Sequence, residues 1–183
     1  MEKLKIIGGN KLSGSISCSG AKNAALPMLA ATILSDQPIT FKNLPYLQDI
    51  TTMFEILGSM GADITLNESM DFIISTSKLH DFEARYELVK TMRASILVLG
   101  SLVARHGFAR IALPGGCAIG TRPVDFHLDA LAKLGAKIEL KNGYIEATAK
   151  KLIGCDINFP GVSVTGTETV SYTHLTLPTK RIV

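Results

Sequence analysis

The chain has 183 residues, of which 46% are hydrophobic and 19% charged, and it carries a formal net charge of +3 at pH 7. This composition excludes a disordered, coiled-coil or collagen-like chain, and the charge is too small for a dedicated nucleic-acid-binding protein, although it suits a small anionic substrate. The length allows one ordinary domain or two very small ones.

Apolar stretches are short and the cysteines are widely spaced. The longest apolar runs, 24–34 and 94–104, fall short of the roughly 20 residues that a membrane span needs, so no membrane partner is expected. The N-terminus lacks the apolar stretch of a secretory signal peptide, which predicts a cytoplasmic protein. Three cysteines without a C-x-x-C pair indicate neither a disulfide framework nor a zinc site, and no cofactor is expected.

The first predicted unit starts with a buried helix. Apolar residues lie on all sides of segment 22–30, which is typical of a helix inside a core. A later helix is predicted by Ile50, Phe54 and Leu57, which recur at helical spacing before a Gly that can take the left-handed conformation. In chain order the unit reads helix from 22, strand 38–41, a helix that ends at a Gly, strand 62–66 and strand 71–74.

The second unit repeats this order about 70 residues later. Segment 131–140 echoes segment 57–66, because each contains a Leu, then a Gly-Ala pair, then an alternating strand. The elements of the second unit are an apolar helix from 92, strand 108–112, a helix with Leu128, Leu131 and Leu134, strand 136–140 and strand 143–147. The sequence therefore predicts an α/β fold of repeated units, one at 21–89 and one at 90–157.

A third unit begins at 162–168 but does not develop. The Ser/Thr/Gly-rich turn there can cap a helix. The segment that follows, 170–183, combines β-branched and aromatic residues with Pro178, which makes it a poor buried helix. It also resembles the translation of a sequencing-library adapter joined to an open reading frame. We therefore interpret 170–183 as a non-native tail, with a divergent terminal strand as the alternative.

The loop 113–125 carries the most informative cysteine, Cys117. Glycines surround it, so little apolar mass is available to bury it, and Arg122 is near enough in sequence to lower the pKa of its thiol. This environment is typical of a reactive thiol, although a lone Cys in a glycine-rich turn is often incidental. Cys18 and Cys155 lie beside strand-like alternation, and we interpret them as small core residues.

Three cationic residues stand where predicted helices begin, namely Lys22, Arg93 and Arg122. The turn before Lys22 offers backbone N–H groups and an ammonium to an oxyanion. Arg93 occupies the repeat position of Asn23, where a second anion could be held. The alternatives are a solvated helix cap for Lys22 and surface arginines that pair with Glu87 or Asp125.

Two further motifs do not support a functional interpretation. Segment 14–22 superficially resembles a Walker A loop, but its spacing is wrong and no Ser or Thr follows Lys22, which disfavours nucleotide triphosphate hydrolysis. His127 lies on an amphipathic helix close to Asp125, and we interpret it as a surface or core residue rather than a catalytic base.

Three segments together resemble a known family. They are Ser19–Pro27, Pro114–Asp125 and Val162–Glu168. Over residues 1–169 the chain is similar to the enolpyruvyl transferase family, and within it to the members that act on a sugar nucleotide. The Pro-Gly-Gly-Cys and Arg-Pro-Val-Asp sequences favour these members over the shikimate-pathway enzyme, which stays an alternative. A non-catalytic sugar-nucleotide-binding module is the other alternative.

The resemblance implies an inside-out α/β barrel architecture. Family members have two domains, each of three βαβαββ units with helices packed inside, and substrates lie in the cleft between the domains. They run to more than twice this length, so we expect an N-terminal fragment. Residues 1–20 would belong with the absent second domain, and 21–169 would form the first domain, truncated in its third unit.

The resemblance also implies a role for individual residues. Cys117 would add to phosphoenolpyruvate or protonate its methylene carbon, and the antibiotic fosfomycin would alkylate it. Lys22, Arg93 and Arg122 would face the phosphate of phosphoenolpyruvate or the diphosphate of the sugar nucleotide. The other implied substrate-binding residues are Asn23 at the sugar, Arg122, Pro123, Val124 and Asp125 at the uracil, and Ser163, Val164 and Thr165 at the diphosphate.

The implied reaction moves the enolpyruvyl group from phosphoenolpyruvate to the 3'-hydroxyl of UDP-N-acetylglucosamine and releases phosphate, at the start of peptidoglycan precursor synthesis. It needs an acid near the methylene carbon, a base near the hydroxyl, and cations around the leaving phosphate. The family's aspartate base lies beyond residue 169. We therefore expect this fragment to be inactive alone, and the sequence does not indicate its oligomeric state.

Overall fold

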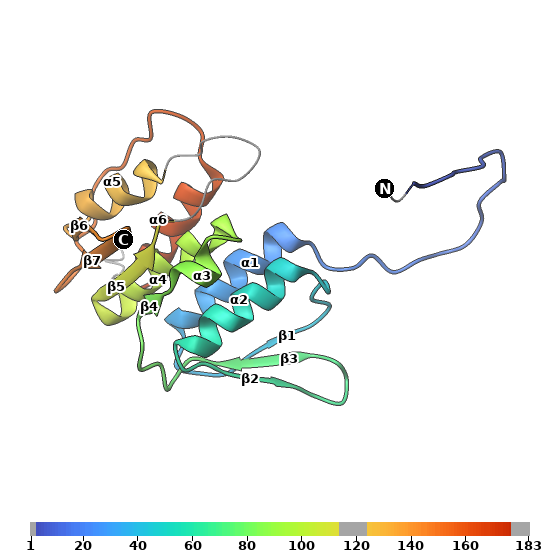
Figure 1. The fold of residues 1–183 in the computed structure, drawn as a ribbon, viewed down its shortest axis with the longest axis horizontal. Helices are drawn as coiled ribbons and strands as arrows, with labels where there is room; N and C mark the ends of the chain where they lie inside the picture. Colours follow the sequence, from blue (N-terminus) through green and yellow to red (C-terminus); the bar gives the residue numbers. More distant parts are fainter. Residues whose placement is uncertain (1–2, 114–123, 177–183) are drawn as a thin grey trace, which may run out of the picture.

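The computed structural model describes residues 3–113 and 124–176, with the side chains described as far as Thr173 (Figure 1). The first unit consists of α1 (Lys22–Ala31), the 3-10 turn η1 (Thr32–Leu34), β1 (Ile39–Phe41), α2 (Gln48–Ser59), β2 (Asp63–Leu66) and β3 (Phe72–Ser75). The second consists of β4 (Glu83–Ala84), α3 (Tyr86–Val89), the 3-10 turn η2 (Arg93–Ile96), α4 (Leu97–His106), β5 (Phe108–Ala112), α5 (Asp125–Lys133), β6 (Lys137–Lys141) and β7 (Tyr144–Thr148). The last helix in the described residues is α6 (Val164–Thr176).

Both units use the same antiparallel strand pairing, which confirms the predicted repeat. β3 lies between β1 and β2, and β7 lies between β5 and β6. Ile74 on β3 pairs with Ile39 and Ile64, and Ile145 takes the same place in the second sheet. Ile74 and Ile145 are both fully buried, because opposite residues share a face of the sheet and this face packs on helices.

The second unit contains two short elements that the sequence pattern does not predict. β4 pairs in parallel with β5, and α3 follows it directly. Arg110 on β5 binds the carboxylates of Glu83 and Glu146, and its guanidinium lies 3.9 Å from the ring centroid of Tyr144. A strand of two residues and a helix of four are too short to show a hydrophobic period, so neither can be found from spacing.

Helix α4 is the centre of the core. Its residues from Leu97 to Val103 are all buried, as expected for a helix that is apolar on every side. It packs on α1, β5 and α6. At Gly100 the helices α4 and α6 come so close that an added Cβ would lie 2.8 Å from Cγ2 of Thr169.

Helix α6 corrects one expectation. The sequence predicts that segment 170–183 forms a poor buried helix, but residues 170–176 are helical. Thr169, Tyr172 and Thr173 on this helix are buried. The hydroxyl groups find partners, because Thr173 Oγ1 donates to the carbonyl oxygen of Val170 at 2.7 Å. Packing against α4 and α5 therefore overrides the low helix propensity of these residues. Whether 170–183 is native to the protein stays a prediction.

The N-terminal segment 3–20 forms neither helix nor strand and extends away from the rest of the chain (Figure 1). Its large apolar side chains, including Leu12 and Ile16, are exposed. The expectation of core positions for Cys18 and Cys155 is wrong, because both are exposed. The alternating residues beside them join none of the described strands, so no sheet covers them. No described helix has the length and apolar character needed to cross a membrane.

Candidate functional site

Lys22 and Asn23 form the first turn of α1. Ala21 precedes them in extended conformation, and its carbonyl oxygen accepts the first helical hydrogen bonds from the amides of Ala24 and Ala25. Lys22 Nζ lies 2.7 Å from Oδ2 of Asp49, in the first turn of α2, with 43% of the lysine side chain and 32% of the aspartate exposed. The ammonium is therefore held at a fixed place at the start of two helices, and solvent still reaches it.

Arg93 is the first residue of η2, the 3-10 turn that leads into the buried helix α4, and its side chain is half-buried. Glu87, one of the two carboxylates considered as its partner, forms an ion pair with Lys90. The positive charge of Arg93 acts on the imidazole of His127 and contributes to lowering its pKa. Arg93 thus lies within electrostatic range of α5.

The structure brings two of the predicted segments together, at the first turns of α5 and α6. Asp125 opens α5, and Ser163 precedes α6 and caps it, since its Oγ accepts a hydrogen bond from the amide of Gly166 at 3.1 Å. A Cβ added at Gly166 would lie 3.5 Å from Cβ of Phe126, so the two first turns are in contact. Val124 is half-buried and Val164 is exposed.

His127 links these turns from inside the core. Its side chain is fully buried, and Nε2 lies 3.1 Å from Oγ1 of Thr165 while Nδ1 lies 2.8 Å from Oγ1 of Thr169. Burial, together with the charge of Arg93, lowers the pKa of His127 to about 4. The ring is therefore neutral at pH 7, and the interpretation of His127 as a core residue is confirmed.

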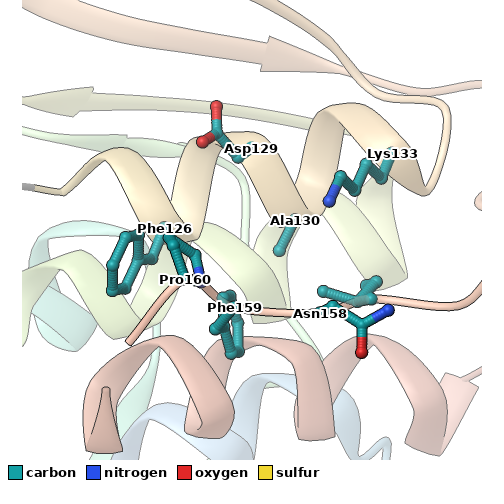
Figure 2. Close-up of a pocket in the computed structure, with 8 residues that line it drawn as sticks. Phe126, Asp129, Ala130, Lys133, Asn158, Phe159 and Pro160 are labelled. Carbon is teal, nitrogen blue, oxygen red and sulfur yellow. The ribbon is translucent and has the colours of Figure 1, made fainter. Parts of the chain in front are cut away.

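A small hollow lies beside the predicted uracil-binding segment. It is lined by Phe126, Asp129, Ala130 and Lys133 of α5 and by residues 157–160 of the chain that leads to α6. Figure 2 shows Phe126 at one end of the hollow and Lys133 and Asn158 at the other. The rings of Phe126 and Phe159 stack with centroids 5.6 Å apart. Phe126, at the aromatic end of the hollow, is the residue that follows Asp125 in the sequence.

Some predicted site residues cannot be placed. Cys117, Arg122 and Pro123 lie outside the described residues. Among the residues that are described, no group of three or more His, Cys, Asp or Glu side chains is arranged to hold a metal ion. Sequence reasoning missed Asp49 and Thr169, which bind Lys22 and His127. An acidic residue in the first helical turn was a usable signal for Asp49, whereas Thr169 is 42 residues from His127 and gives none.

Comparison with known proteins identifies relatives along nearly the whole chain. A family model described as EPSP synthase (3-phosphoshikimate 1-carboxyvinyltransferase) matches residues 6–175. The UDP-N-acetylglucosamine 1-carboxyvinyltransferase of Halorhodospira halophila is 56% identical over 168 residues, which are 92% of this chain and 40% of the relative. The protein of the same name from Coxiella burnetii is 56% identical over 169 residues, 92% of this chain and 39% of the relative. The chain thus spans about 40% of the length of these curated relatives.

Solved structures share the fold at lower identity. The enolpyruvyl transferase NikO from Streptomyces tendae superposes with a TM-score of 0.72 at 24% identity, covering 91% of this chain and 39% of that chain. EPSP synthase from Acinetobacter baumannii gives a TM-score of 0.67 at 15% identity, covering 87% of this chain and 37% of that chain. These matches confirm the expected enolpyruvyl-transferase type of α/β fold.

Proposed function

Because the chain belongs to the EPSP synthase (3-phosphoshikimate 1-carboxyvinyltransferase) family, we propose that it is the N-terminal part of an enolpyruvyl transferase that acts on a sugar nucleotide. The whole enzyme transfers the enolpyruvyl group from phosphoenolpyruvate to the 3'-hydroxyl of UDP-N-acetylglucosamine and releases phosphate. The observation that carries this proposal is the 56% identity, along 92% of the chain, to relatives named for that activity. The role would be cytoplasmic, at the start of bacterial peptidoglycan precursor synthesis.

The proposed chemistry assigns a task to each type of residue. Protonation of the methylene carbon of phosphoenolpyruvate creates a cationic carbon, and the sugar hydroxyl adds to it and loses its proton. Phosphate then leaves, and the new methyl group gives up a proton as the double bond reforms. Cys117 would supply the acid, and Lys22, Arg93 and Arg122 would stabilise the phosphate groups. The proton of the sugar hydroxyl needs a base, and we place this base in the part of the enzyme that follows residue 169.

The positions of the described residues support binding of an anion. The ammonium of Lys22 is held near the first turns of α1 and α2 by its 2.7 Å ion pair with Asp49. The first turn of α6, which follows Ser163, presents backbone N–H groups whose aligned dipoles favour a negative charge. We propose that Asn23 contacts the sugar, that residues 122–125 contact the uracil, and that residues 163–165 contact the diphosphate.

We propose the following division of the chain. Residues 1–20 belong with a second domain, an assignment supported by the exposed apolar side chains of the extended arm. Residues 21–169 form the first domain with two complete units, 21–89 and 90–157, and the start of a third. Substrates would bind in the cleft that the second domain completes, so the chain alone lacks one wall of the site. Residues 170–183 are proposed to be a non-native tail.

The name of the matching family, 3-phosphoshikimate 1-carboxyvinyltransferase, favours a second candidate function, transfer to shikimate 3-phosphate. Heteronuclear NMR titration of the chain with UDP-N-acetylglucosamine and, separately, with shikimate 3-phosphate distinguishes the two. We expect UDP-N-acetylglucosamine to shift the amide signals of residues 124–125 and 163–165, and shikimate 3-phosphate to leave them unchanged. The reverse result would assign the chain to the shikimate pathway. An unchanged spectrum with both ligands would contradict a substrate-binding role for this fragment.

A further inference from the structure

His127, in the first turn of α5, bonds to α6 through both ring nitrogens, and these bonds reach two successive turns of α6. Nε2 faces Thr165 in the first turn, and Nδ1 faces Thr169 one turn later. The imidazole and Thr169 are fully buried, whereas Thr165 is half-buried, so the bond to Thr169 is shielded from water and the bond to Thr165 is shielded in part. Each bond is therefore a direct link between the first turn of α5 and a defined position on α6.

The protonation state of the ring suits this double contact. A neutral imidazole has one N–H donor and one nitrogen acceptor, and each threonine hydroxyl can both donate and accept. Protonation would turn both nitrogens into donors and would place a positive charge in the core, close enough to Arg93 to be repelled by it. The buried, neutral ring thus holds both threonines at neutral pH.

The surroundings of α6 leave it little freedom to move as a rigid body. On one side Gly100 of α4 lies against Thr169, and on the other Gly166 lies against Phe126. Within the first turn Gly166 packs on Phe126, but Val164 is exposed, so this end of α6 is less covered than the turn at Thr169. The bond between His127 and Thr165 is a partly buried polar contact that connects this turn to α5.

We propose that His127 is a positioning residue that fixes the first turn of α6, residues 163–167, in the place where it would meet a diphosphate group. The inference rests on the proposed function, since that function assigns the diphosphate to residues 163–165. His127 is buried and acts on a ligand only through Thr165. It is therefore a determinant of sugar-nucleotide binding that carries out no proton transfer.

Two amide replacements separate the two bonds. In His127→Gln the amide group reaches the place of Nε2 and can still bind Thr165, whereas in His127→Asn it reaches only the place of Nδ1 and can still bind Thr169. His127→Leu removes both bonds at similar volume. Thr169→Val is the matched control, because it removes the other bond of His127 and leaves the bond to Thr165 in place.

The measurements are the dissociation constant for UDP and the hydrogen exchange rates of the amides of Gly166 and Thr167, both by NMR on the full chain. For His127→Leu and His127→Asn we expect about tenfold weaker UDP binding and at least tenfold faster exchange at these amides, with unchanged exchange at Ile145 in β7. His127→Gln and Thr169→Val should stay within about twofold of the unchanged chain in both measurements. Amides of 166–167 that exchange equally in all five proteins would overturn the proposal.

The two readouts keep this inference separate from the proposed function. If the unchanged chain binds no UDP, the assignment of residues 163–165 to a diphosphate is wrong, and the exchange rates still decide whether His127 fixes the turn. If UDP binds equally to His127→Gln and His127→Asn, the bond to Thr165 does not control the site and the proposal fails. Should His127→Leu not fold, the comparison of the Gln and Asn variants gives the answer.

Discussion

The hydroxyl group of Tyr172 donates a hydrogen bond to the carbonyl oxygen of Pro27, with an O–O distance of 2.8 Å across 145 residues of sequence. Pro27 lies inside α1, so this bond joins α1 to α6, the first and last helices of the described residues. Burial, together with the charge of Glu168, raises the pKa of Tyr172, so its hydroxyl stays protonated and able to donate. Tyr172 lies within the segment interpreted from sequence as a non-native tail.

Replacing Tyr172 by Phe tests whether this contact stabilises the chain. The ring still fills its place, but the bond to Pro27 is lost, so we expect the free energy of unfolding to fall by about 1 kcal/mol. Tyr86→Phe is the control, because Tyr86 is about half exposed and should change stability by less than about 0.5 kcal/mol. Urea denaturation measures both. Equal stability of the two variants would indicate that segment 170–176 does not pack as described and would support its non-native origin.

Gly100→Ala tests the close approach of α4 and α6. The added methyl group would lie 2.8 Å from Cγ2 and 3.0 Å from the carbonyl oxygen of Thr169, so α6 must shift. We expect a loss of about 1 to 3 kcal/mol of stability. Gly58→Ala is the matched control in an exposed position of α2, where a Cβ meets nothing within 4 Å, and it should stabilise the chain by up to about 1 kcal/mol. A stabilising Gly100→Ala would contradict the packing.

Arg105→Ala tests the contact between the two units. Arg105 Nη1 donates to the carbonyl oxygens of Ile33 and Ser35 at 2.6 and 2.8 Å, and Nη2 binds Asp36, so α4 is tied to the end of η1. We expect thermal and urea denaturation to show a loss of about 2 to 3 kcal/mol. Arg85 is exposed, and its Nη2 lies 3.6 Å from Oδ2 of Asp81. Arg85→Ala should therefore lower the free energy of unfolding by less than about 0.5 kcal/mol. Similar losses for both arginines would refute the proposed tie.

The pH dependence of stability tests the buried state of His127. The pKa of this group is about 4 in the folded chain and 6.5 when unfolded, so only the unfolded chain takes up a proton between these values. Stability should therefore fall by about 3 kcal/mol as the pH is lowered from 6.5 to 4. Burial also lowers the pKa of His106, so the comparison must be with His127→Gln, which keeps His106 and should show a shallower decline. Identical slopes would mean that His127 is not buried and neutral.

Local sequence patterns account for the elements of both units. Strand 108–112 has the predicted bounds, and Gly61 and Gly135 take the positive φ angles, 102° and 97°, expected where the two amphipathic helices end. These features depend on a few neighbouring residues, so spacing alone determines them. β4 and α3 escape prediction because they are shorter than the period that would reveal them.

Features that depend on distant residues could not be predicted. The alternation around Cys18 suggested a strand, but a strand needs a partner, and no strand of segments 3–113 or 124–176 pairs with it. The position of Arg93 at a helix start followed from the repeat, whereas the ion pair of Lys22 with Asp49 and the contact of His127 with Thr169 required the folded chain. The low helix propensity of residues 170–176 predicted a poor buried helix, and this prediction is wrong because the packing of buried side chains outweighs propensity.

Transfer activity tests the central claim most directly. The test uses a chimera in which residues 1–169 of this chain replace the corresponding part of the Halorhodospira halophila relative. Phosphate release is measured with phosphoenolpyruvate and UDP-N-acetylglucosamine, singly and together, and with shikimate 3-phosphate in place of the sugar nucleotide. We predict release that requires both substrates, is lost in Cys117→Ala, and is absent for the 183-residue chain alone, because we propose that the base and one wall of the cleft come from the rest of the enzyme. A folded chimera that releases no phosphate, or that releases it only with shikimate 3-phosphate, would contradict the proposed function.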